Sequence, residues 1–417
     1  MKRLIFILSA TLGLTTMQAQ EISLDSCQSW ARQNHPLLKQ SGVIDEISTL
    51  KQQSIESGNL PQIDLTGRAT YQSDVTKLLI SNPNFKLRDL SKDQYKLYID
   101  IKQKLYDGGI SKSRKAVEVV DRKISQQQNE TDLYKIKETV NLLYFQTLTL
   151  QENKHILELK KQMLDERIGV VASAVKNGMV LPNDLDNLKA EQLLTDQQLT
   201  EVIAGQQTTA DLLSLITGKS ISPESKYSIP VIANENSTIS RPELMLFSLQ
   251  KDKLESNKKL LDDSRKPYAF AFGQVGYGRP GLNMLNDGFD DWYMVGLGIS
   301  WNIWDGRKAK NDRAALQKQK GLIDIQRENF ERNINLSATQ ERNNAGKMAK
   351  LIESDRQIVA LKEQIAKRSA SALDNGTLTS ADYIRDLNAS LQSKISLEIH
   401  KIQKIQALVN LNTILGN

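Results

Sequence analysis

The chain has 417 residues and a formal net charge of +6, and its charged residues, 25% of the total, mix both signs. This composition is typical of a solvated surface and does not predict nucleic-acid binding. The single Cys excludes a disulfide scaffold and a Cys-ligated metal site. The three His residues lie far apart and none has the HxxxH or HxH spacing of a zinc site, so the sequence predicts neither a His-based metal site nor a catalytic triad. We therefore expect no metal, no cofactor and no catalytic centre.

Residues 1–19 have the features of a secretory signal peptide. Lys2 and Arg3 precede a short apolar run, and small or polar residues lead to a cleavage site expected after Ala19. The alternative, an N-terminal membrane anchor, would need about 20 apolar residues. Beyond this segment no apolar run is long enough for a spanning helix. The mature chain is therefore expected to be exported, either as a soluble protein or as a β-barrel in a membrane.

The rest of the chain contains an internal duplication. The predicted copies are residues 20–217 and 241–417, and residues 218–240, rich in Ser, Pro and Asn, form the linker between them. Four landmarks recur in the same order in both copies: Pro36 and Pro242, Pro61 and Pro267, Asp107 and Asp305, Gly178 and Gly376. Four ordered matches are hard to obtain by chance, so each copy should repeat one structural pattern.

Each copy contains a segment in which apolar and polar residues alternate, as in β-strands. The alternation predicts β-hairpins at 62–106 and 268–304, with strands close to the roughly 9–11 residues that cross a bilayer. A soluble sheet covered on one face would show the same pattern. A membrane sheet is favoured because aromatic residues gather near the strand ends, like an interfacial girdle. These residues are Tyr71, Tyr95, Tyr98, Tyr106, Trp292, Tyr293, Trp301 and Trp304.

Long polar helices are predicted outside the hairpins. Residues 110–176 and 308–374 contain no Pro, and at about 1.5 Å per residue each helix would be about 100 Å long. Such length predicts a coiled coil or helical tube. Shorter helices are expected at 24–57, 183–217, 242–264 and 379–415. Their lengths suggest that each short pair packs end to end along the long helix of its own copy.

Turn residues mark both ends of each long helix. Asp107-Gly108 and Asp305-Gly306 lie between strand and helix, where Asp can cap the helix and Gly allows unusual backbone angles. An ordinary turn explains these residues equally well. The far ends carry Asn-Gly pairs, where Gly suits the left-handed position after a helix.

Four strands cannot close a barrel, and lipid does not tolerate open sheet edges. Copies of the chain would therefore have to combine their hairpins. Two copies would give about eight strands and a filled interior, whereas three would give about twelve strands and an aqueous bore. The strand faces that would line this bore carry polar residues: Arg68, Lys96, Asp100, Lys102, Lys104 and Asn302. The pattern therefore predicts a conduit.

The sequence resembles the TolC-type outer-membrane efflux protein family over essentially its whole mature length. The resemblance is carried by the segments Trp30–Leu37, Leu60–Gln62, Tyr106–Gly109, Trp304–Arg307, Gly178–Asp184 and Gly376–Asp382. It implies an α+β membrane protein, in which a homotrimeric twelve-stranded barrel continues into a coiled-coil periplasmic tunnel. It also implies docking of a periplasmic adaptor protein and an inner-membrane transporter. The implied function is a passive exit duct for efflux or type I secretion, without enzymatic activity.

The resemblance also implies a gate at the ends of the long helices. Asp184 and Asp382 match acidic positions that narrow or close the tunnel entrance in the family. Arg385, with Asp386 beside it, stands where a second acidic residue is expected. Alternatively, Asp184 and Asp382 only stabilise the first turns of their helices. The predicted adaptor contacts are the exposed tips: Gly178, Met179, Val180, Leu181, Gly376, Thr377 and Leu378.

Two other functions compete with the conduit. A secreted coiled-coil adhesin or stalk would explain the helices, but it would explain neither the paired hairpins nor the duplication. An exported enzyme would need a nucleophile, phosphate loop or metal motif, and we find none in the sequence. The acidic pair Asp262-Asp263 has the spacing of a solvated turn.

Overall fold

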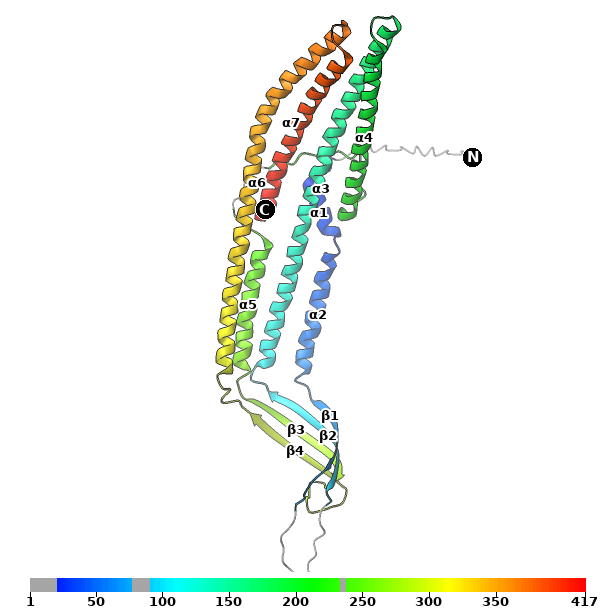
Figure 1. Ribbon diagram of the computed structural model, residues 1–417. Helices are drawn as coiled ribbons and strands as arrows, with labels where there is room; N and C mark the ends of the chain where they lie inside the picture. Colours follow the sequence, from blue (N-terminus) through cyan, green and yellow to red (C-terminus); the bar gives the residue numbers. More distant parts are fainter. Residues whose placement is uncertain (1–20, 77–90, 233–237) are drawn as a thin grey trace, which may run out of the picture. The chain divides into compact units, whose positions relative to one another are not determined.

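The computed structural model describes residues 21–76, 91–232 and 238–417 (Figure 1). The predicted signal peptide lies outside these residues, as do parts of the predicted loop of the first hairpin and of the linker. Helices account for most of the described chain, and four strands form one antiparallel sheet. The predicted combination of long helices with a small antiparallel sheet is therefore confirmed. None of the helices in the described part is long and apolar enough to span a bilayer.

The elements follow the order helix, hairpin, long helix, helix in both halves of the chain. In the first half they are α1 (Leu24–Asn34), α2 (Leu37–Ser57), β1 (Gln62–Tyr71), β2 (Asp93–Tyr106), α3 (Ile110–Lys176) and α4 (Pro182–Thr217). In the second half they are α5 (Pro242–Asp263), β3 (Tyr268–Arg279), β4 (Asp290–Ser300), α6 (Lys308–Asp374) and α7 (Ser380–Leu415).

The single helix expected over 24–57 is wrong, because the chain breaks into α1 and α2. Pro36 has no backbone N–H, and a residue before proline is disfavoured in the helical region. His35 accordingly has extended angles, with φ −71° and ψ 134°. Its Nδ1 accepts a hydrogen bond of 3.2 Å from the Leu37 amide. This break separates the short α1 from α2.

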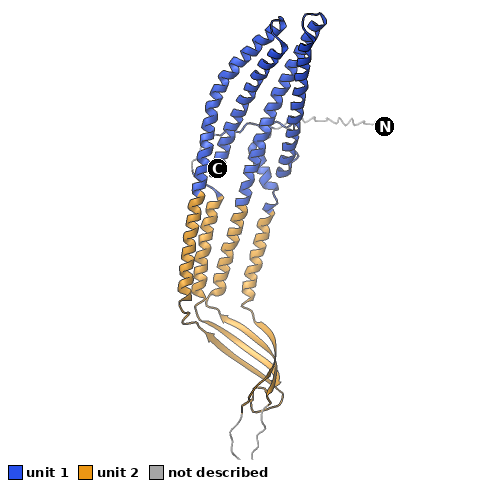
Figure 2. Cartoon of the chain, in the orientation of Figure 1, with its two compact units in different colours: residues 1–38, 131–241, 331–417 blue, residues 39–130, 242–330 orange. Residues whose placement is uncertain are grey.

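The described chain forms two compact units (Figure 2). Among the described residues, those within 1–38, 131–241 and 331–417 form unit 1, and those within 39–130 and 242–330 form unit 2. Both long helices, α3 and α6, contribute one segment to each unit.

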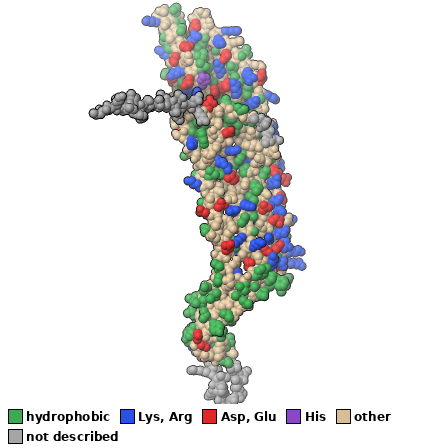
Figure 3. Space-filling view, turned by 180° about the vertical axis from the view of Figure 1, so that it is seen from behind, with side chains coloured by type: hydrophobic (Ala, Val, Ile, Leu, Met, Phe, Trp, Pro, Cys, Tyr) green, Lys and Arg blue, Asp and Glu red, His purple; other side chains and the backbone are tan. Residues whose placement is uncertain are grey.

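The sheet belongs to unit 2 and has the strand order β1-β2-β3-β4. Its register aligns apolar residues across all four strands, as in the row that joins Leu65, Ile99, Val275 and Tyr293. Because side chains alternate between faces, one face is largely apolar, and most of its large side chains are exposed. Its exposed large apolar and aromatic members include Ile63, Leu65, Tyr71, Tyr95, Leu97, Ile99, Ile101, Val275, Tyr277, Tyr293, Val295, Leu297 and Ile299. Figure 3 shows hydrophobic side chains gathered over this sheet.

The opposite face of the sheet is largely polar on β1 and β2. Its middle row joins Asp64, Asp100, Gln274 and Met294. Asp100 is buried there, and it forms an ion pair of 2.7 Å with Lys102 and accepts a 3.1 Å hydrogen bond from Gln274. The sheet thus has one face suited to an apolar environment and one suited to water.

The predicted second hairpin is too long at its end, because β4 stops at Ser300 rather than near residue 304. Ser300 pairs with Tyr268, the first residue of β3, and the preceding residue is Pro267. Proline cannot donate a ladder hydrogen bond, so the pairing ends there. Asn302, predicted to lie on the polar strand face, is therefore outside the strand.

In unit 2, polar contacts join each short helix to a long one. Gln126 of α3 donates to Asp45 of α2 over 2.7 Å. On the other side, Lys320 of α6 pairs with Glu255 of α5 at 2.9 Å. These contacts lie on exposed or partly exposed surfaces, so each contributes little stability alone.

In unit 1, the last part of α3 packs with α4 and the last part of α6 packs with α7. Ion pairs of 2.6 Å join Lys161 to Asp196 in the first hairpin and Lys394 to Glu363 in the second. A buried apolar cluster connects the two helical hairpins. Its members are Ile156, Leu164, Val171, Leu188, Leu373, Tyr383, Leu387 and Leu391.

Candidate functional site

The two helical hairpins of unit 1 have tips with the same backbone design. Gly178 and Gly376 follow the long helices with φ of 72° and 67°, a left-handed conformation that favours glycine. The next residues, Met179 and Thr377, each donate a backbone hydrogen bond of 2.9 Å to a carbonyl in the last helical turn. This is the glycine-based ending that the Asn-Gly pairs predict.

The helices that follow these tips begin differently. Pro182 opens α4 at a position where its missing N–H carries no cost. In α7 the Thr379 side chain caps the helix by accepting from the Asp382 amide over 3.2 Å. Ser380, the first residue of α7, is fully buried, whereas Pro182 is exposed.

The tip residues predicted to contact a partner divide into two groups. Met179 and Leu181 are 70% and 71% exposed and available to another molecule. Val180 and Leu378 instead pack against the buried cluster between the hairpins. Thr377 donates its hydroxyl hydrogen bond to the Ala372 carbonyl over 3.0 Å, within its own tip. The exposed apolar surface of the tips is therefore concentrated on the α3–α4 turn.

Asp184 links the first hairpin to the second. Its Oδ1 accepts hydrogen bonds from the Ser380 amide at 3.0 Å and from the Ser380 hydroxyl at 2.7 Å. Because Ser380 begins α7, the carboxylate also lies at the positive end of that helix dipole. Asp184 thus contacts the opposite hairpin and does more than stabilise the first turn of its own helix.

Asp382, Arg385 and Asp386 are arranged locally. Arg385 pairs with Asp382 at 2.9 Å and approaches Asp386 at 3.4 Å, all within α7. Asp386 also accepts from the Ser369 hydroxyl of α6 at 2.5 Å. These bonds lie within the α6–α7 hairpin, and Arg385 offsets the negative charge that Asp382 was expected to present.

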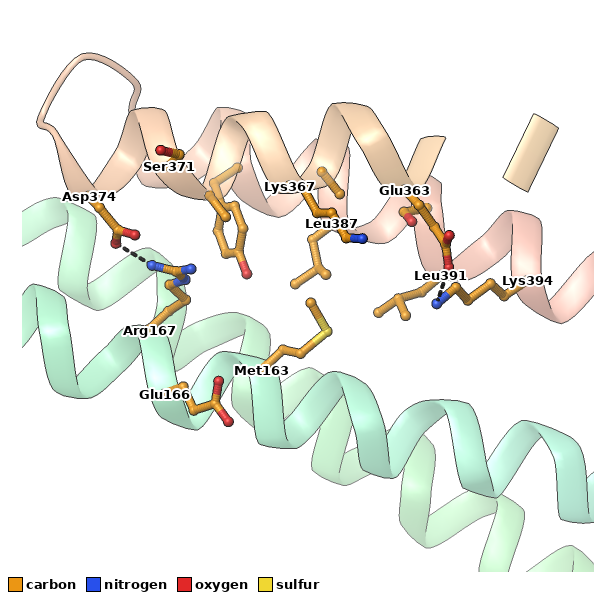
Figure 4. Close-up of a pocket in the computed structure, with 14 residues that line it drawn as sticks. Met163, Glu166, Arg167, Glu363, Lys367, Ser371, Asp374, Leu387, Leu391 and Lys394 are labelled. Carbon is orange, nitrogen blue, oxygen red and sulfur yellow. Dashed lines mark hydrogen bonds and ion pairs between the residues drawn. The ribbon is translucent and has the colours of Figure 1, made fainter. Parts of the chain in front are cut away.

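Arg167 forms a second link between the hairpins, which the sequence did not reveal. Its guanidinium, on α3, pairs with Asp374 at the end of α6, and its central carbon lies 5.7 Å from the ring centre of Tyr383 on α7. Figure 4 shows this pair at one end of a cavity of about 350 Å³. Met163, Leu387 and Leu391 point into the cavity from both hairpins.

A third link lies further from the tips. Glu191 of α4 accepts from Lys160 of α3 at 2.7 Å and from Asn388 of α7 at 2.9 Å. Burial alone would raise the pKa of Glu191, but these two hydrogen bonds outweigh it and hold the pKa below its ordinary value. The carboxylate therefore stays ionised and keeps both partners.

The strand-to-helix turns of unit 2 are alike in the two halves. Asp107 accepts from the Gly109 and Ser111 amides, and Asp305 accepts from the Arg307 and Ala309 amides, over 2.7–3.1 Å. Both carboxylates cap a long helix. Gly108 and Gly306 have φ of 71° and 64°, the unusual backbone angles for which glycine was expected at these turns.

Known proteins show the same fold and part of the sequence pattern. Residues 29–218 match the family model described as outer membrane efflux protein. This match covers 190 of the 417 residues, so the sequence likeness to the outer membrane efflux protein family lies in the first half of the chain. No curated protein is significantly similar to the chain in sequence.

Solved structures extend the likeness over nearly the whole chain. The outer membrane protein VceC of Vibrio cholerae is 14% identical with a TM-score of 0.65, and the match covers 94% of this chain and 96% of that one. The CmeC outer membrane channel of Campylobacter jejuni is 14% identical, with a TM-score of 0.64 and coverages of 94% and 85%. The open state of the Neisseria gonorrhoeae MtrE outer membrane channel is 12% identical, with a TM-score of 0.65 and coverages of 94% and 89%. At these identities the likeness shows a shared fold.

The family-model match, together with the shared fold, indicates the location and the general role. The protein resides in the outer membrane with a periplasmic extension, and it acts as an efflux channel. This is a family of channels rather than of enzymes. Among the described residues, no three His, Cys, Asp or Glu side chains are grouped as metal ligands.

Proposed function

We propose that this efflux protein is a homotrimeric exit duct, gated at its helical tips, in a tripartite efflux or type I secretion system. The observation that carries the proposal is the sheet with an exposed apolar face and two unpaired edges, β1 and β4. An unpaired edge is too costly in lipid, so the edges must pair with those of other copies. Three copies supply about twelve strands, enough to enclose water.

Exposed apolar residues on the helices of unit 1 also support assembly from several copies. Leu351, Ile358 and Ile365 recur every seven residues on α6 and are 36–44% exposed. Such a repeat is typical of a helix that packs against another helix. On α4 the exposed apolar residues are Leu193, Leu194, Ile203, Leu212 and Leu215. Neighbouring protomers would cover these surfaces.

The purified mature protein in detergent tests this assembly and its channel activity together. We expect a mass of three chains and stepwise conductance when it is added to planar lipid bilayers. A monomer that stays soluble without detergent and gives no conductance would favour the secreted stalk instead.

The gate in this proposal is formed by the contacts between the two hairpins of each protomer. Asp184–Ser380, Arg167–Asp374 and Glu191–Asn388 all join the α3–α4 hairpin to the α6–α7 hairpin. Opening would separate the hairpins at their tips, so each contact favours the closed arrangement. Asp382, Arg385 and Asp386 would line the entrance as partly neutralised charges.

The exposed α3–α4 tip would dock the periplasmic adaptor, which in turn connects the duct to an inner-membrane transporter. Met179 and Leu181 are apolar side chains exposed at a helical turn, which suits end-on contact with another helical hairpin.

Crosslinking in cells checks this docking site. A photoreactive probe on a cysteine at Met179 should capture a periplasmic adaptor, whereas the same probe on a cysteine at Lys219, beyond the other end of α4, should not. Capture of the same adaptor with equal yield at both positions would contradict docking at the tip.

A further inference from the structure

The loop between β3 and β4, residues 280–289, exposes apolar side chains at the end of the sheet away from the helices. Leu282, Met284, Leu285 and Phe289 are 50–62% exposed. Asp287 is the only charged residue in this segment. Apolar residues gathered in a short exposed loop indicate contact with another apolar phase.

Hydrogen bonds tie the base of this loop to Ser91 and to Arg279 of β3. Asp287 accepts from the Ser91 amide at 2.7 Å, from the Ser91 hydroxyl at 2.9 Å and from the Arg279 guanidinium at 3.0 Å. Arg279 also donates to the Asp287 carbonyl over 2.9 Å. The one charge of the loop is thus paired, so the loop can leave water without exposing an isolated ion.

Aromatic stacking makes the loop continuous with the apolar face of the sheet. Phe289 stacks on Tyr277 of β3, with ring centres 5.6 Å apart, and on Tyr95 of β2, with ring centres 6.2 Å apart. Both tyrosines belong to the exposed apolar face. The stacked rings therefore join the apolar side chains of the loop and of the sheet into one continuous surface.

We infer that the loop 280–289 lies in the outer leaflet of the outer membrane and buries Leu282, Met284 and Leu285 among lipid acyl chains. This assignment rests on the proposed barrel, in which the apolar sheet face contacts lipid. The helices extend into the periplasm, so the opposite end of the hairpin reaches the external leaflet. The loop then widens the lipid contact of each protomer beyond its strands and fixes the depth of the barrel.

Fluorescence quenching in liposomes tests the lipid contact. Three variants, Met284→Cys, Val295→Cys and Met294→Cys, would be labelled with an environment-sensitive dye in the assembled protein. The native Cys27 is fully buried, and burial raises the pKa of its thiol to about 12, so it does not compete for label. Lipids with a nitroxide near the top of the acyl chain quench from the bilayer, and iodide quenches from water.

The two β4 positions serve as references, because Val295 is on the apolar face and Met294 on the opposite face. We expect lipid quenching at Met284 to reach at least about half of that at Val295, with little quenching by iodide. Asp287→Asn in the Met284→Cys background should reduce the lipid quenching roughly twofold, because the loop loses its anchor.

Quenching of Met284 by iodide to the extent seen at Met294 would overturn the inference, because the loop would then face water or the bore. Shielding of Met284 from both quenchers would overturn it too, since protein would then cover the loop. If Val295 itself is not quenched by lipid, the proposed barrel fails and not only the loop.

Discussion

Val295→Arg will remove most of the protein from the outer membrane. Val295 lies in the middle of β4, is 75% exposed and belongs to the apolar face. Arginine at the middle of a bilayer costs about 2–4 kcal/mol in a membrane strand. One such change per protomer of a trimer should lower the amount of assembled protein by roughly 30-fold or more. Immunoblotting of outer-membrane fractions under conditions that preserve trimers measures this amount.

Met294→Arg is the matched control for this experiment. Met294 precedes Val295 on the same strand and is 40% exposed, but it lies on the opposite sheet face, in the row with Asp64 and Asp100. Arginine should be tolerated there, with assembly close to that of the native protein. Equal losses for the two variants would show that the apolar face does not contact lipid.

The double change Arg167→Ala with Asp184→Ala will open the channel. It removes two of the links between the hairpins, one from α3 to α6 and one from α4 to α7. Partly exposed ionic hydrogen bonds of this kind are worth about 1 kcal/mol each. Losing both should raise the ratio of open to closed protomers roughly 30-fold. Single-channel recording in planar bilayers measures it as longer and larger openings.

Lys161→Ala provides the control for the gate. Lys161 pairs with Asp196 inside the α3–α4 hairpin, so its removal deletes an ion pair of similar exposure without affecting contact between the hairpins. Its conductance should match that of the native channel. The proposed gate would be refuted by a double variant that opens no more than this control.

The fold could be predicted well from the sequence because its signals are local and long. The 67-residue helices α3 and α6 contain no proline, and the strands alternate strictly enough to assign their faces. The errors arose where one proline affected its neighbours. Pro36 divides the first helix. Pro267 lies next to β3, opposite the end of β4, and ends the pairing of β4 there. The alternation of residues within β4 does not show this effect.

The candidate gate could be predicted only in part. Asp184 and Asp382 were singled out through the family resemblance, but the residues that they contact could not be derived from the sequence. Arg167 and Asp374 are separated by 207 residues, and Arg167 lies within a long helix rich in charged residues. Nothing in that local sequence distinguishes it from its neighbours. Only the packing of one hairpin against the other brings the pair together.

The bond between Asp184 and Ser380 makes the two halves of each subunit non-interchangeable. Pro182 occupies in the first half the place that Ser380 occupies in the second, and proline has neither an amide hydrogen nor a hydroxyl to offer. A reciprocal bond to Asp382 is therefore impossible. A ring built from six identical first halves would have an Asp184 carboxylate at each tip to accept a hydrogen bond. It would have a proline in place of every Ser380, so no group would donate that bond. The bond between the α3–α4 tip and the α6–α7 tip therefore depends on a sequence difference between the two halves of the chain.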